Sequence, residues 1–539
     1  MSEAPAPPID SLPTPPPPED DPTRRGVFGR FLAIVEWLGN LLPHPVTLFA
    51  IFALGVVVLS GLLGDVSVMD PRPEGAKGRA DDGMIRAVSL MNAEGVRRIL
   101  QGLVTNFTNF VPLGTVLVAM LGVGIAEGSG LLSALIRLVV LKAPARLLTM
   151  AVVFAGVLSN TASEMGYVVL VPLAGTVFLA LGRHPLAGMA AAFAGVSGGY
   201  SANLLIGTVD PLLAGITQEA AQLIDPTYEV HAAVNWYFMS ISTVMITLVG
   251  TWVTVSIVEP NLGTYDDSRA EEGVRDPNAT RPVSALEIKG LLYAAGSLVA
   301  LIIGLALLVV PEGAMLRNPE TGELLNSPFL RSVVAFIFIF FAVPGIIYGR
   351  IVGTMRSDHE IIEGMASAMR TLGLYIVLVF FAAQFVAFFK WTNLGAILAV
   401  EGADLLKSIG LTGPLVFIPF ILMCCLVNLS LGSASAQWAV TAPIFVPMLM
   451  LLGYSPEVIQ AAYRIGDSTT NIITPMMSYF GLILAFACRF DRRLGIGTIV
   501  STMLPYTLAF LGAWIILFYG WVFGLGMPVG PEAPTFYTP

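Results

Sequence analysis

The chain has 539 residues, of which 55% are hydrophobic and only 12% are charged, and its mean hydropathy is +0.78. In soluble globular proteins about a quarter of the residues are charged, so this composition excludes that class and indicates a membrane protein. The net charge of −9 comes without any basic cluster, which excludes a nucleic-acid partner. Four scattered histidines and three cysteines in apolar runs give neither a metal-binding spacing nor a disulfide framework, so we expect no cofactor.

Residues 1–26 form a proline-rich segment without the apolar core that a signal peptide needs, so they are predicted to be a disordered cytoplasmic tail. Arg24, Arg25 and Arg30 stand before the first apolar run. Because positive charges stay on the cytoplasmic side of a membrane, the N-terminus is expected inside.

Apolar runs follow one another along the rest of the chain. A helix that crosses a membrane needs about 20 mostly apolar residues. Uncharged runs near or above this length occur at 37–64, 99–126, 233–257, 290–310, 332–349, 371–389, 408–456, 468–488 and 494–530. They predict an all-α polytopic membrane protein with about nine transmembrane helices. Two transmembrane halves are expected at 27–258 and 285–530, with a cytoplasmic linker at 259–284 and an external tail at 531–539.

Basic residues indicate which ends of the spans are cytoplasmic. The segments RLVVLKAPAR (137–146) and RFDRR (489–493), with Arg350 and Arg356, are interpreted as cytoplasmic turns. One loop disagrees with this pattern. Residues 65–98 carry six Lys and Arg, yet they must be external if the runs on both sides are simple spans.

An internal repeat relates the two halves. Aligning Pro172 with Pro443, an offset of 443 − 172 = 271, places LGRHP (181–185) on LGYSP (452–456). The spacing holds without a gap from about residue 159 to 200, and we interpret it as a duplication.

Each copy contains a short apolar segment, at 161–182 and 432–453, that a proline near its middle is expected to split. Half of such a segment is about ten residues or roughly 15 Å of helix, which is half a bilayer. The pattern predicts two re-entrant helical hairpins. The span before the first copy starts beside cytoplasmic residues 142–146, whereas the span at 411–430 starts outside. The copies are therefore expected to be inverted, as is common in secondary transporters.

Polar sequence is predicted to interrupt the helix after each hairpin, at SGGYSANLL (197–205) and at DSTTNIITP (467–475). Non-helical backbone at membrane depth persists only inside protein or beside water, because lipid cannot hydrogen-bond its N–H and C=O groups. These breaks are predicted to line a cavity, and Asn203 lies in the first of them.

Arg464, Asp467, Ser468 and Asn471 fall on one face of a helix. A charge at the bilayer centre costs at least about 2.5–3.5 kcal/mol, so these side chains should face one another or a wet site. They form either a structural ion pair or a functional site. The break expected after Ser468, and the uncharged residues at the matching positions of the first copy, favour function.

Asp210, in IGTVDPLLAGI, is an isolated acid between apolar segments. An isolated membrane carboxyl group is a candidate proton carrier. The Asp-Pro pair fits the N-cap of a helix over 211–219 equally well, and the two roles are compatible.

The first hairpin opens with SNTASE (159–164), which supplies Ser159, Asn160, Thr161 and the acid Glu164. Hydroxyl and amide groups of this kind suit a sodium ion, or a substrate carboxylate at a half-helix N-terminus. Simple capping of the hairpin helices is the alternative.

The second hairpin opens with NLSLGSASAQW (428–438), which supplies Asn428, Ser435 and Trp438. A tryptophan in a membrane protein is usually an interface anchor or a packing residue. The position of Trp438 beside Ser435 and Gln437 favours a contact with an aromatic substrate.

The chain resembles the AbgT family of transporters, which move p-aminobenzoyl-glutamate and, in some members, export sulfonamide antimetabolites. The likeness covers nearly all of the chain after the tail and is strongest in GVSGGYSANLLIGTVDPLLAG (195–215), GSASAQWAVTAPIFVPM (432–448) and AYRIGDSTTNIITPMMSYF (462–480). It implies a homodimer in the bacterial inner membrane, with nine spans and two opposed hairpins per subunit, a scaffold domain at the dimer interface and an inner substrate domain. The family's functional positions match Asp210, Asn428, Ser435, Trp438, Arg464, Asp467 and Pro475.

In the wider ion-transporter superfamily, SNT motifs at hairpin tips help to bind sodium and carboxylate. Residues 159–161 read Ser-Asn-Thr, but the second copy offers only Asn428 and Ser430 nearby. This departure argues against a symmetric two-sodium mechanism.

Together these features predict a secondary active transporter for p-aminobenzoyl-glutamate-like aromatic acids, with proton-coupled efflux of sulfonamide antimetabolites as one mode. Its partners would be a small-molecule substrate and the lipid bilayer. Asp210 and Asp467 would take and release protons, Arg464 would hold a carboxylate or sulfonyl group, and Trp438 would contact the ring. The remaining substrate and polar contacts are assigned to Asn160, Asn203, Asn428, Ser435, Asn471 and Pro475.

Sodium-coupled carboxylate symport is the alternative, with a sodium ion at Ser159, Asn160 and Thr161 and Glu164 nearby. A passive channel fits less well, because inverted halves suit alternating access. An intramembrane enzyme would need a nucleophile with a base, or metal ligands, and the histidines are badly placed for either. The residues leave open import or export.

Overall fold

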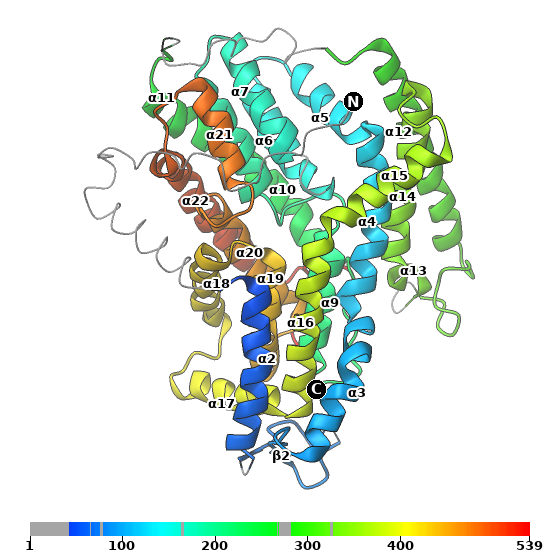
Figure 1. The fold of residues 1–539 in the computed structure, drawn as a ribbon, viewed down its shortest axis with the longest axis vertical. Helices are drawn as coiled ribbons and strands as arrows, with labels where there is room; N and C mark the ends of the chain where they lie inside the picture. The colour runs from blue at the N-terminus through cyan, green and yellow to red at the C-terminus, as the bar shows by residue number, and fades with distance from the viewer. Residues whose placement is uncertain are drawn as a thin grey trace, which may run out of the picture.

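A computed structural model describes residues 43–64, 66–75, 79–162, 166–266, 268, 282–323 and 327–538. It is an elongated bundle of helices with one small β-ribbon at its lower end (Figure 1). The expected tail at 1–26 and the acid Glu164 lie outside the described residues, as does most of the expected linker.

The elements of the first half are α2 (Pro45–Leu62), β1 (Ser67–Met69), β2 (Met84–Arg86), α3 (Ala93–Thr108), α4 (Val111–Ser129), α5 (Leu131–Leu141), α6 (Leu148–Ser159), η3 (Asn160–Ala162), η4 (Gly166–Leu170), α7 (Val171–Ala180), α8 (Pro185–Phe193), η5 (Ala194–Gly198), α9 (Val209–Ala221), α10 (Trp236–Val253), η6 (Thr254–Val258) and α11 (Glu259–Leu262).

The elements of the second half are α12 (Ala285–Val309), α13 (Pro328–Arg331), α14 (Val333–Val352), α15 (Asp358–Thr371), α16 (Gly373–Trp391), α17 (Leu394–Ser408), η8 (Pro414–Val416), α18 (Phe417–Leu431), α19 (Ala434–Met450), α20 (Pro456–Asn471), α21 (Phe480–Phe490), α22 (Ile496–Phe518) and η9 (Tyr519–Gly524).

Eight helical stretches within the described residues are long and apolar enough to cross a membrane: 45–62, 93–129, 236–262, 285–309, 333–352, 373–391, 414–431 and 496–524. Two of the long apolar runs are interrupted close to the positions predicted from the sequence. The run 408–456 contains the membrane-length stretch 414–431, which includes α18, and the shorter apolar helix α19, separated at Gly432 and Ser433. The run 468–488 is not one helix, because α20 ends at Asn471 and α21 begins at Phe480.

The helices pack into two groups. Helices α4, α12, α14 and α15 pack against one another and enclose small apolar clusters. One large core joins α2, α6–α10 and α16–α22, and most of the predicted site residues are buried polar side chains on or beside these helices. Helix α12 is almost entirely exposed although it is apolar, as expected of a surface that contacts lipid or another subunit.

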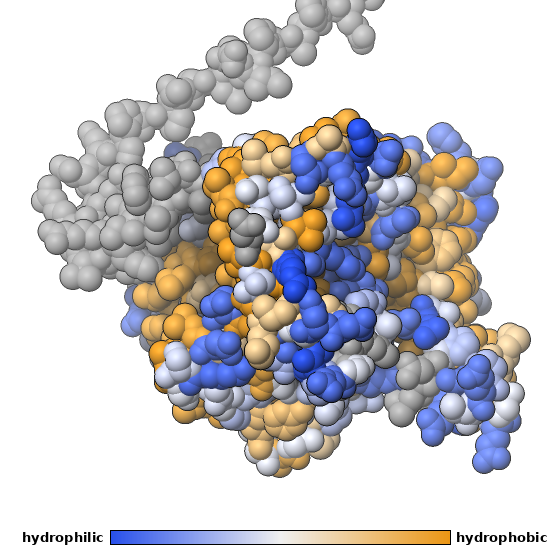
Figure 2. Space-filling model, turned by 90° about the horizontal axis from the view of Figure 1, so that it is seen from below, coloured by the Kyte–Doolittle hydropathy of each residue, from blue (hydrophilic) through white to orange (hydrophobic). Residues whose placement is uncertain are grey.

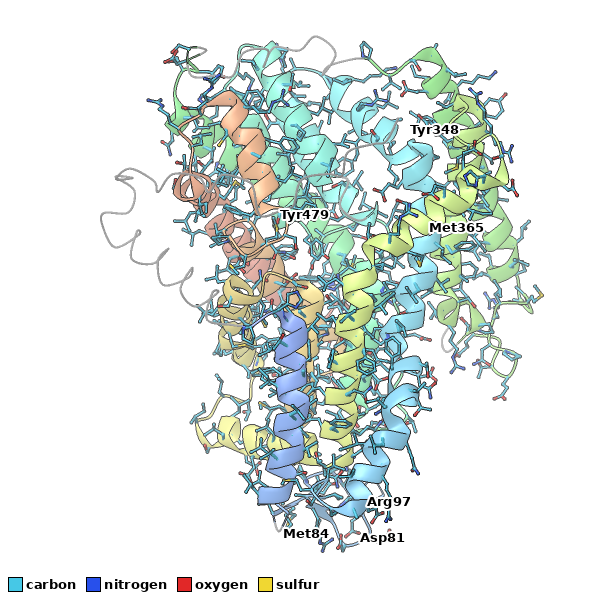
Figure 3. All side chains as sticks on the ribbon, in the orientation of Figure 1. Asp81, Met84, Arg97, Tyr348, Met365 and Tyr479 are labelled. Atoms are coloured by element: carbon cyan, nitrogen blue, oxygen red, sulfur yellow. The ribbon has the colours of Figure 1, made fainter. Side chains whose placement is uncertain are left out.

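The loop between α2 and α3 holds the β-ribbon, in which Val68 pairs with Ile85 in antiparallel register. Figure 3 shows Asp81, Met84 and Arg97 together at this lower end. Two basic side chains of this loop form ion pairs with acids of the same loop. Arg72 pairs with Asp70 at 2.6 Å, and Arg86 pairs with Asp82 at 2.5 Å. From below, hydrophilic residues cover much of this face, with apolar residues around its sides (Figure 2).

Two helix starts coincide at the offset found in the sequence. Helix α20 begins 271 residues after α8, and α21 begins 271 residues after α9. The α7–α8 turn lies at the upper end of Figure 1, where Arg183 pairs with Glu259 of α11 at 2.5 Å. The α19–α20 turn lies at the lower end, where Tyr454 bridges to Phe536 beside the C-terminus.

The expectation that a proline splits each short apolar segment is wrong. Helix α19 runs through Pro443 without interruption, and η4 and α7 are continuous from Gly166 to Ala180. Membrane helices tolerate proline where neighbouring groups satisfy the freed carbonyls. The chain is interrupted earlier instead. In the second copy it turns at Gly432, which has φ +54°.

Candidate functional site

The buried polar helix α20 forms the centre of the candidate site. All of its residues from Pro456 to Asn471 are buried, although many of them are polar. Its N-terminus is capped by the Ser455 side chain, which accepts a hydrogen bond from the Val458 N–H. A polar helix inside a membrane protein needs partners on its neighbours, because lipid offers none.

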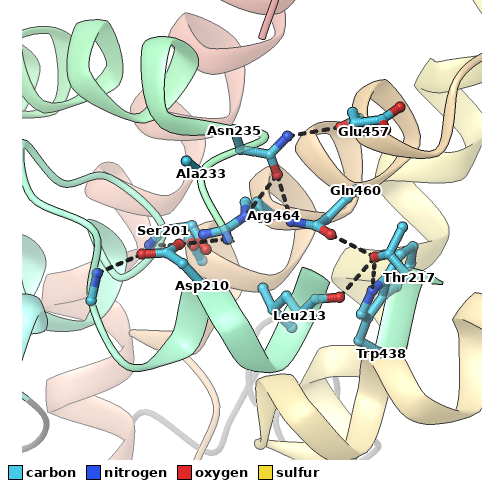
Figure 4. Close-up of polar contacts among 12 residues, drawn as sticks. Ser201, Asp210, Leu213, Thr217, Ala233, Asn235, Trp438, Glu457, Gln460 and Arg464 are labelled. Carbon is cyan, nitrogen blue, oxygen red and sulfur yellow. Dashed lines mark hydrogen bonds and ion pairs between the residues drawn. The ribbon is translucent and has the colours of Figure 1, made fainter. Parts of the chain in front are cut away.

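Arg464 finds its ion-pair partner on α9. Its Nη2 donates to Oδ1 of Asp210 at 2.6 Å, and its Nε donates to Oδ1 of Asn235 at 3.1 Å (Figure 4). Both charged side chains are no more than 4% exposed. The sequence analysis assigned Arg464 and Asp210 to one functional site, but it did not predict that their side chains contact each other.

Asp210 lies in the first turn of α9, but it is not the helix N-cap. Thr208 is the N-cap of this helix. The expectation that Asp210 caps a helix over 211–219 is therefore wrong, because the helix begins two residues earlier. The second carboxylate oxygen of Asp210 accepts from the Gly207 N–H at 2.7 Å. One carboxylate therefore holds the start of α9 and neutralises the guanidinium of α20.

Trp438 belongs to the same network. Its Nε1 donates to the Thr217 hydroxyl at 2.8 Å, and that hydroxyl donates to Oε1 of Gln460 at 2.5 Å (Figure 4). The indole stacks on Tyr463, with ring centroids 4.2 Å apart and an interplanar angle of 22°. Ser435, one turn before Trp438, is half-buried and lies 3.3 Å from the Ser433 hydroxyl.

Asp467 is buried near the charge of Arg464 but makes no ion pair with it in the described part of the chain. Its side chain is 0% exposed, and neither carboxylate oxygen has a hydrogen-bond partner within the described part of the chain. The nearby Tyr463 hydroxyl donates to the Ala434 carbonyl instead, at 2.6 Å. An ionised carboxylate in this position is costly, and binding a proton or another cation removes the cost.

Asn428 joins α18 to the end of α20. Its Nδ2 donates to the Asp467 carbonyl at 2.7 Å, to the Thr470 hydroxyl at 3.0 Å and to Oδ1 of Asn471 at 2.9 Å. The helix continues to Asn471, so the break begins later than the predicted 467–475 and contains the half-buried Pro475.

The break after α20 packs against the first copy. Tyr479 stacks on Tyr167, with ring centroids 4.7 Å apart and planes 6° apart. Figure 3 shows Tyr479 in the upper half of the molecule, at the lower end of α21. The two copies also meet where the Ser201 N–H donates to the Ser468 hydroxyl at 3.1 Å.

The first hairpin tip connects to the first break. The Thr161 hydroxyl donates to Oδ1 of Asn203 at 3.0 Å, and Nδ2 of Asn160 donates to the Gly199 carbonyl at 3.3 Å. Ser159 donates to the Gly156 carbonyl within its own helix. Oδ1 of Asn160 has no donor among the described residues, so it is the acceptor that a sodium ion could use.

Sequence reasoning missed Asn235, Thr217, Gln460 and Glu457. Gln460 and Glu457 lie on the same face of α20 as Arg464, Asp467, Ser468 and Asn471, and this face is called the polar stripe below. Their spacings are three and four residues, so the same periodicity would have included them. Asn235 follows a loop of irregular structure, and no residue pattern around it indicates a functional position.

Comparison with known proteins decides the family. The family described as "AbgT putative transporter family" matches residues 30–537. The chain belongs to the AbgT family. A curated member, the p-aminobenzoyl-glutamate transport protein of Escherichia coli K12, is 36% identical over 503 residues, covering 93% of this chain and 96% of that protein.

Two solved structures of AbgT transporters share the fold. MtrF of Neisseria gonorrhoeae, described as illuminating a class of antimetabolite efflux pumps, has a TM-score of 0.88 and 61% identity, covering 94% of this chain and 100% of that one. YdaH of Alcanivorax borkumensis, described as a transporter of unusual topology, has a TM-score of 0.83 and 45% identity, covering 91% and 100%. These relatives are named as transporters and efflux pumps, so this AbgT protein is a multi-pass membrane transporter and not an enzyme.

Proposed function

We propose that this AbgT protein is a proton-coupled secondary active transporter of p-aminobenzoyl-glutamate-like aromatic acids and of sulfonamide antimetabolites. The observation that carries the proposal is the buried pair Arg464–Asp210 beside the unpartnered carboxyl group of Asp467. The printed descriptions of the relatives support the same substrates.

Arg464 is the proposed ligand for the carboxylate or sulfonyl group of the substrate. Its planar guanidinium suits bidentate binding of such a group, and Asp210 occupies it in this structure. An anionic substrate would take the place of Asp210 in part or entirely. Trp438, Ser435 and Pro475 are the proposed contacts for the rest of the substrate.

Asp467 is the proposed carrier of the coupling proton. Three observations support this role: its complete burial, the absence of a hydrogen-bond donor for its oxygens in the described part of the chain, and its position one turn from Arg464. Asp210 is the second proposed proton carrier, because a substrate at Arg464 would deprive it of its cation.

Sodium coupling is the second candidate, and a specific observation favours it. Oδ1 of Asn428 and Oε1 of Gln437 are buried without a donor among the described residues, as are both oxygens of Asp467. Uncompensated acceptor oxygens are the ligands that a hard cation prefers. Ser159, Asn160 and Thr161 are the proposed sodium ligands in the first copy, as the sequence suggests.

We further propose a homodimer in the inner membrane with a cytoplasmic N-terminus. The basic turns at 137–146 and 489–493 support this sidedness, and the exposed apolar helix α12 suits contact with lipid or a second subunit. The two segments with coincident helix boundaries are the proposed halves of an alternating-access mechanism, with their turns at opposite ends of the molecule.

Flux in proteoliposomes tests the proposal. Labelled p-aminobenzoyl-glutamate and a labelled sulfonamide are each measured with a pH gradient alone and with a sodium gradient alone. Saturable flux driven by the pH gradient is expected, and its sign distinguishes antiport from symport. Flux that responds only to sodium would select the second candidate, and linear, unsaturable flux would contradict both.

A further inference from the structure

A second buried acid, Glu457, lies on the polar stripe outside the groups used so far. It is in the first turn of α20, and its side chain is 2% exposed. Among the described residues, no Lys, Arg or His nitrogen lies within 4.0 Å of its carboxylate. A buried carboxylate without a cation is stable only if hydrogen bonds compensate its charge or if it binds a proton.

The Glu457 carboxylate interacts with the Ser455 side chain and its own backbone N–H at the start of α20, and with Tyr228 toward the surface. The Tyr228 hydroxyl lies 3.1 Å and 3.0 Å from its two carboxylate oxygens. Tyr228 is half-buried between the exposed residues Thr227 and Glu229, and its ring contacts Tyr537 at 5.9 Å. This is the end of the molecule where the C-terminal segment pairs with the α19–α20 turn.

Several titratable groups surround this contact, including Arg72, which is paired with Asp70, donates to the Ile224 carbonyl and acts on Tyr537 through its charge. Asp225 and Tyr537 act on Tyr228 through their charges, and His231 lies 3.7 Å from Glu532 in the same region. From α20 itself, Arg464 lies two helical turns away, or about 10 Å along the axis. None of these groups forms an ion pair with Glu457 in the described part of the chain.

Glu457 is also linked inward to the substrate site. The Asn235 side chain donates to the Glu457 backbone carbonyl at 2.8 Å and accepts from Nε of Arg464 at 3.1 Å (Figure 4). Gln460 donates to the same Asn235 oxygen at 2.7 Å. The side-chain carboxamide of Asn235 therefore connects the Arg464 side chain to the backbone of Glu457.

We propose that Glu457 is a proton-binding site between the C-terminal face and Arg464, with Tyr228 as its contact to water. A hydronium ion at that face supplies the proton, which adds to a carboxylate oxygen of Glu457 and leaves water. The reverse step returns the proton when the site opens to the other side. This inference rests on the proposed function, and it adds a proton site that Asp210 and Asp467 do not provide.

A purely structural role for Glu457 accounts for its burial less well than a proton-binding role does. An acid at a helix N-terminus interacts favourably with the helix dipole, but burying an ionised carboxylate there adds a desolvation cost of several kcal/mol. At the same offset of 271 residues, the first copy has Leu186, and α8 begins there without any acid in its first turn. Starting such a helix therefore does not require a carboxylate at this position.

The test compares two transport modes of the reconstituted full-length protein. Glu457→Gln keeps the size of the side chain and removes its titration, and Tyr228→Phe removes the donor while retaining the ring. Each is measured for flux of labelled p-aminobenzoyl-glutamate driven by a pH gradient, and for exchange across the membrane at equal pH. Glu127→Gln on α4 is the matched control, because it neutralises an acid outside the stripe.

Glu457→Gln is expected to lower pH-driven flux at least tenfold, with exchange within about twofold of wild type. Tyr228→Phe should show the same pattern more weakly. Equal loss of both modes in a folded variant would assign Glu457 a structural role and overturn the inference. Unchanged pH-driven flux in Glu457→Gln would also overturn it, whereas absence of pH-driven flux in the wild type would overturn the proposed function itself.

Discussion

Nη2 of Arg464 lies 2.6 Å from Oδ1 of Asp210, so an α20 cation is neutralised by an acid 254 residues earlier in the chain. Asp467, three residues after Arg464 on the same helix, has no partner for its carboxylate oxygens among the described residues. The site thus contains one acid that holds the guanidinium and one that is free to bind a proton or a cation.

Replacing only one member of the ion pair Arg464–Asp210 should lower the stability of the protein more than replacing both members. Arg464→Gln leaves a buried carboxylate alone, and Asp210→Asn leaves a buried guanidinium alone. Each single change should cost about 3–5 kcal/mol of stability, and the double variant should recover much of that loss. Thermal unfolding in detergent measures this. A double variant less stable than both single variants would contradict the pairing.

Arg464→Lys should keep the charge but lose the planar fork that binds a carboxylate. The protein should fold, because an ammonium group still neutralises Asp210. Substrate affinity should fall at least tenfold, measured as KM for p-aminobenzoyl-glutamate. Normal KM would mean that Arg464 is not the substrate ligand.

Asp467→Asn should leave the protein as stable as wild type or slightly more so, because the carboxylate has no donor to lose in the described structure. Coupled flux should be abolished, since the amide cannot take up a proton. Thermal unfolding and pH-driven flux are measured on the same preparation. Flux at the normal rate with normal pH dependence would refute the proposed role of Asp467.

Gly432→Ala should destabilise the turn between α18 and α19. This residue has φ +54°, and an added Cβ would lie 2.9 Å from the Met476 carbonyl oxygen in the break after α20. Strain of this kind costs about 1–3 kcal/mol. The matched control is Gly453→Ala, which has φ +93° but open space around the added Cβ. An equal loss in both variants would show that backbone strain, and not the contact with Met476, is responsible.

The loop ion pair Asp70–Arg72 should give a pH-dependent contribution to stability. Burial alone raises the pKa of Asp70, but the hydrogen bonds and charge of Arg72 outweigh it, so its pKa lies below the ordinary value of 3.8. The contribution should be complete above that value and disappear as pH falls through the lowered pKa. Asp70→Asn should remove this acid dependence from unfolding curves; an unchanged dependence would assign it to other acids.

Apolar run lengths predicted the helical membrane fold, because they depend on local sequence alone; the internal repeat between residues 159–200 and the second half stays a prediction. Arg464 and Asp467 were found for the same reason, since charges deep in apolar sequence are conspicuous. The pairing of Arg464 with Asp210 and Asn235 depends on how α9 and the loop before α10 pack on α20. Side-chain spacing within one helix carries no information about such contacts.

The break positions were predicted less well. Thr470 and Thr474 each donate to the carbonyl four residues before them, and Asn428 holds the last turn of α20, so the helix extends beyond Asp467. Serine, threonine and asparagine favour helix ends in isolation, but here they form hydrogen bonds that a buried helix needs. Tertiary partners therefore moved the boundary from about Ser468 to Asn471.

The opposite placement of the α7–α8 and α19–α20 turns gives the molecule two chemically different ends. The turn at the upper end belongs to a copy whose helix α8 carries no charged residue, whereas the turn at the lower end leads directly to Glu457, Arg464 and Asp467. A membrane-impermeant reagent or inhibitor should therefore act with strong sidedness. Changes to α19 and α20 that alter substrate preference should also require matching changes at Asp210, Thr217 and Asn235, because these residues contact Arg464 and Trp438 from other elements.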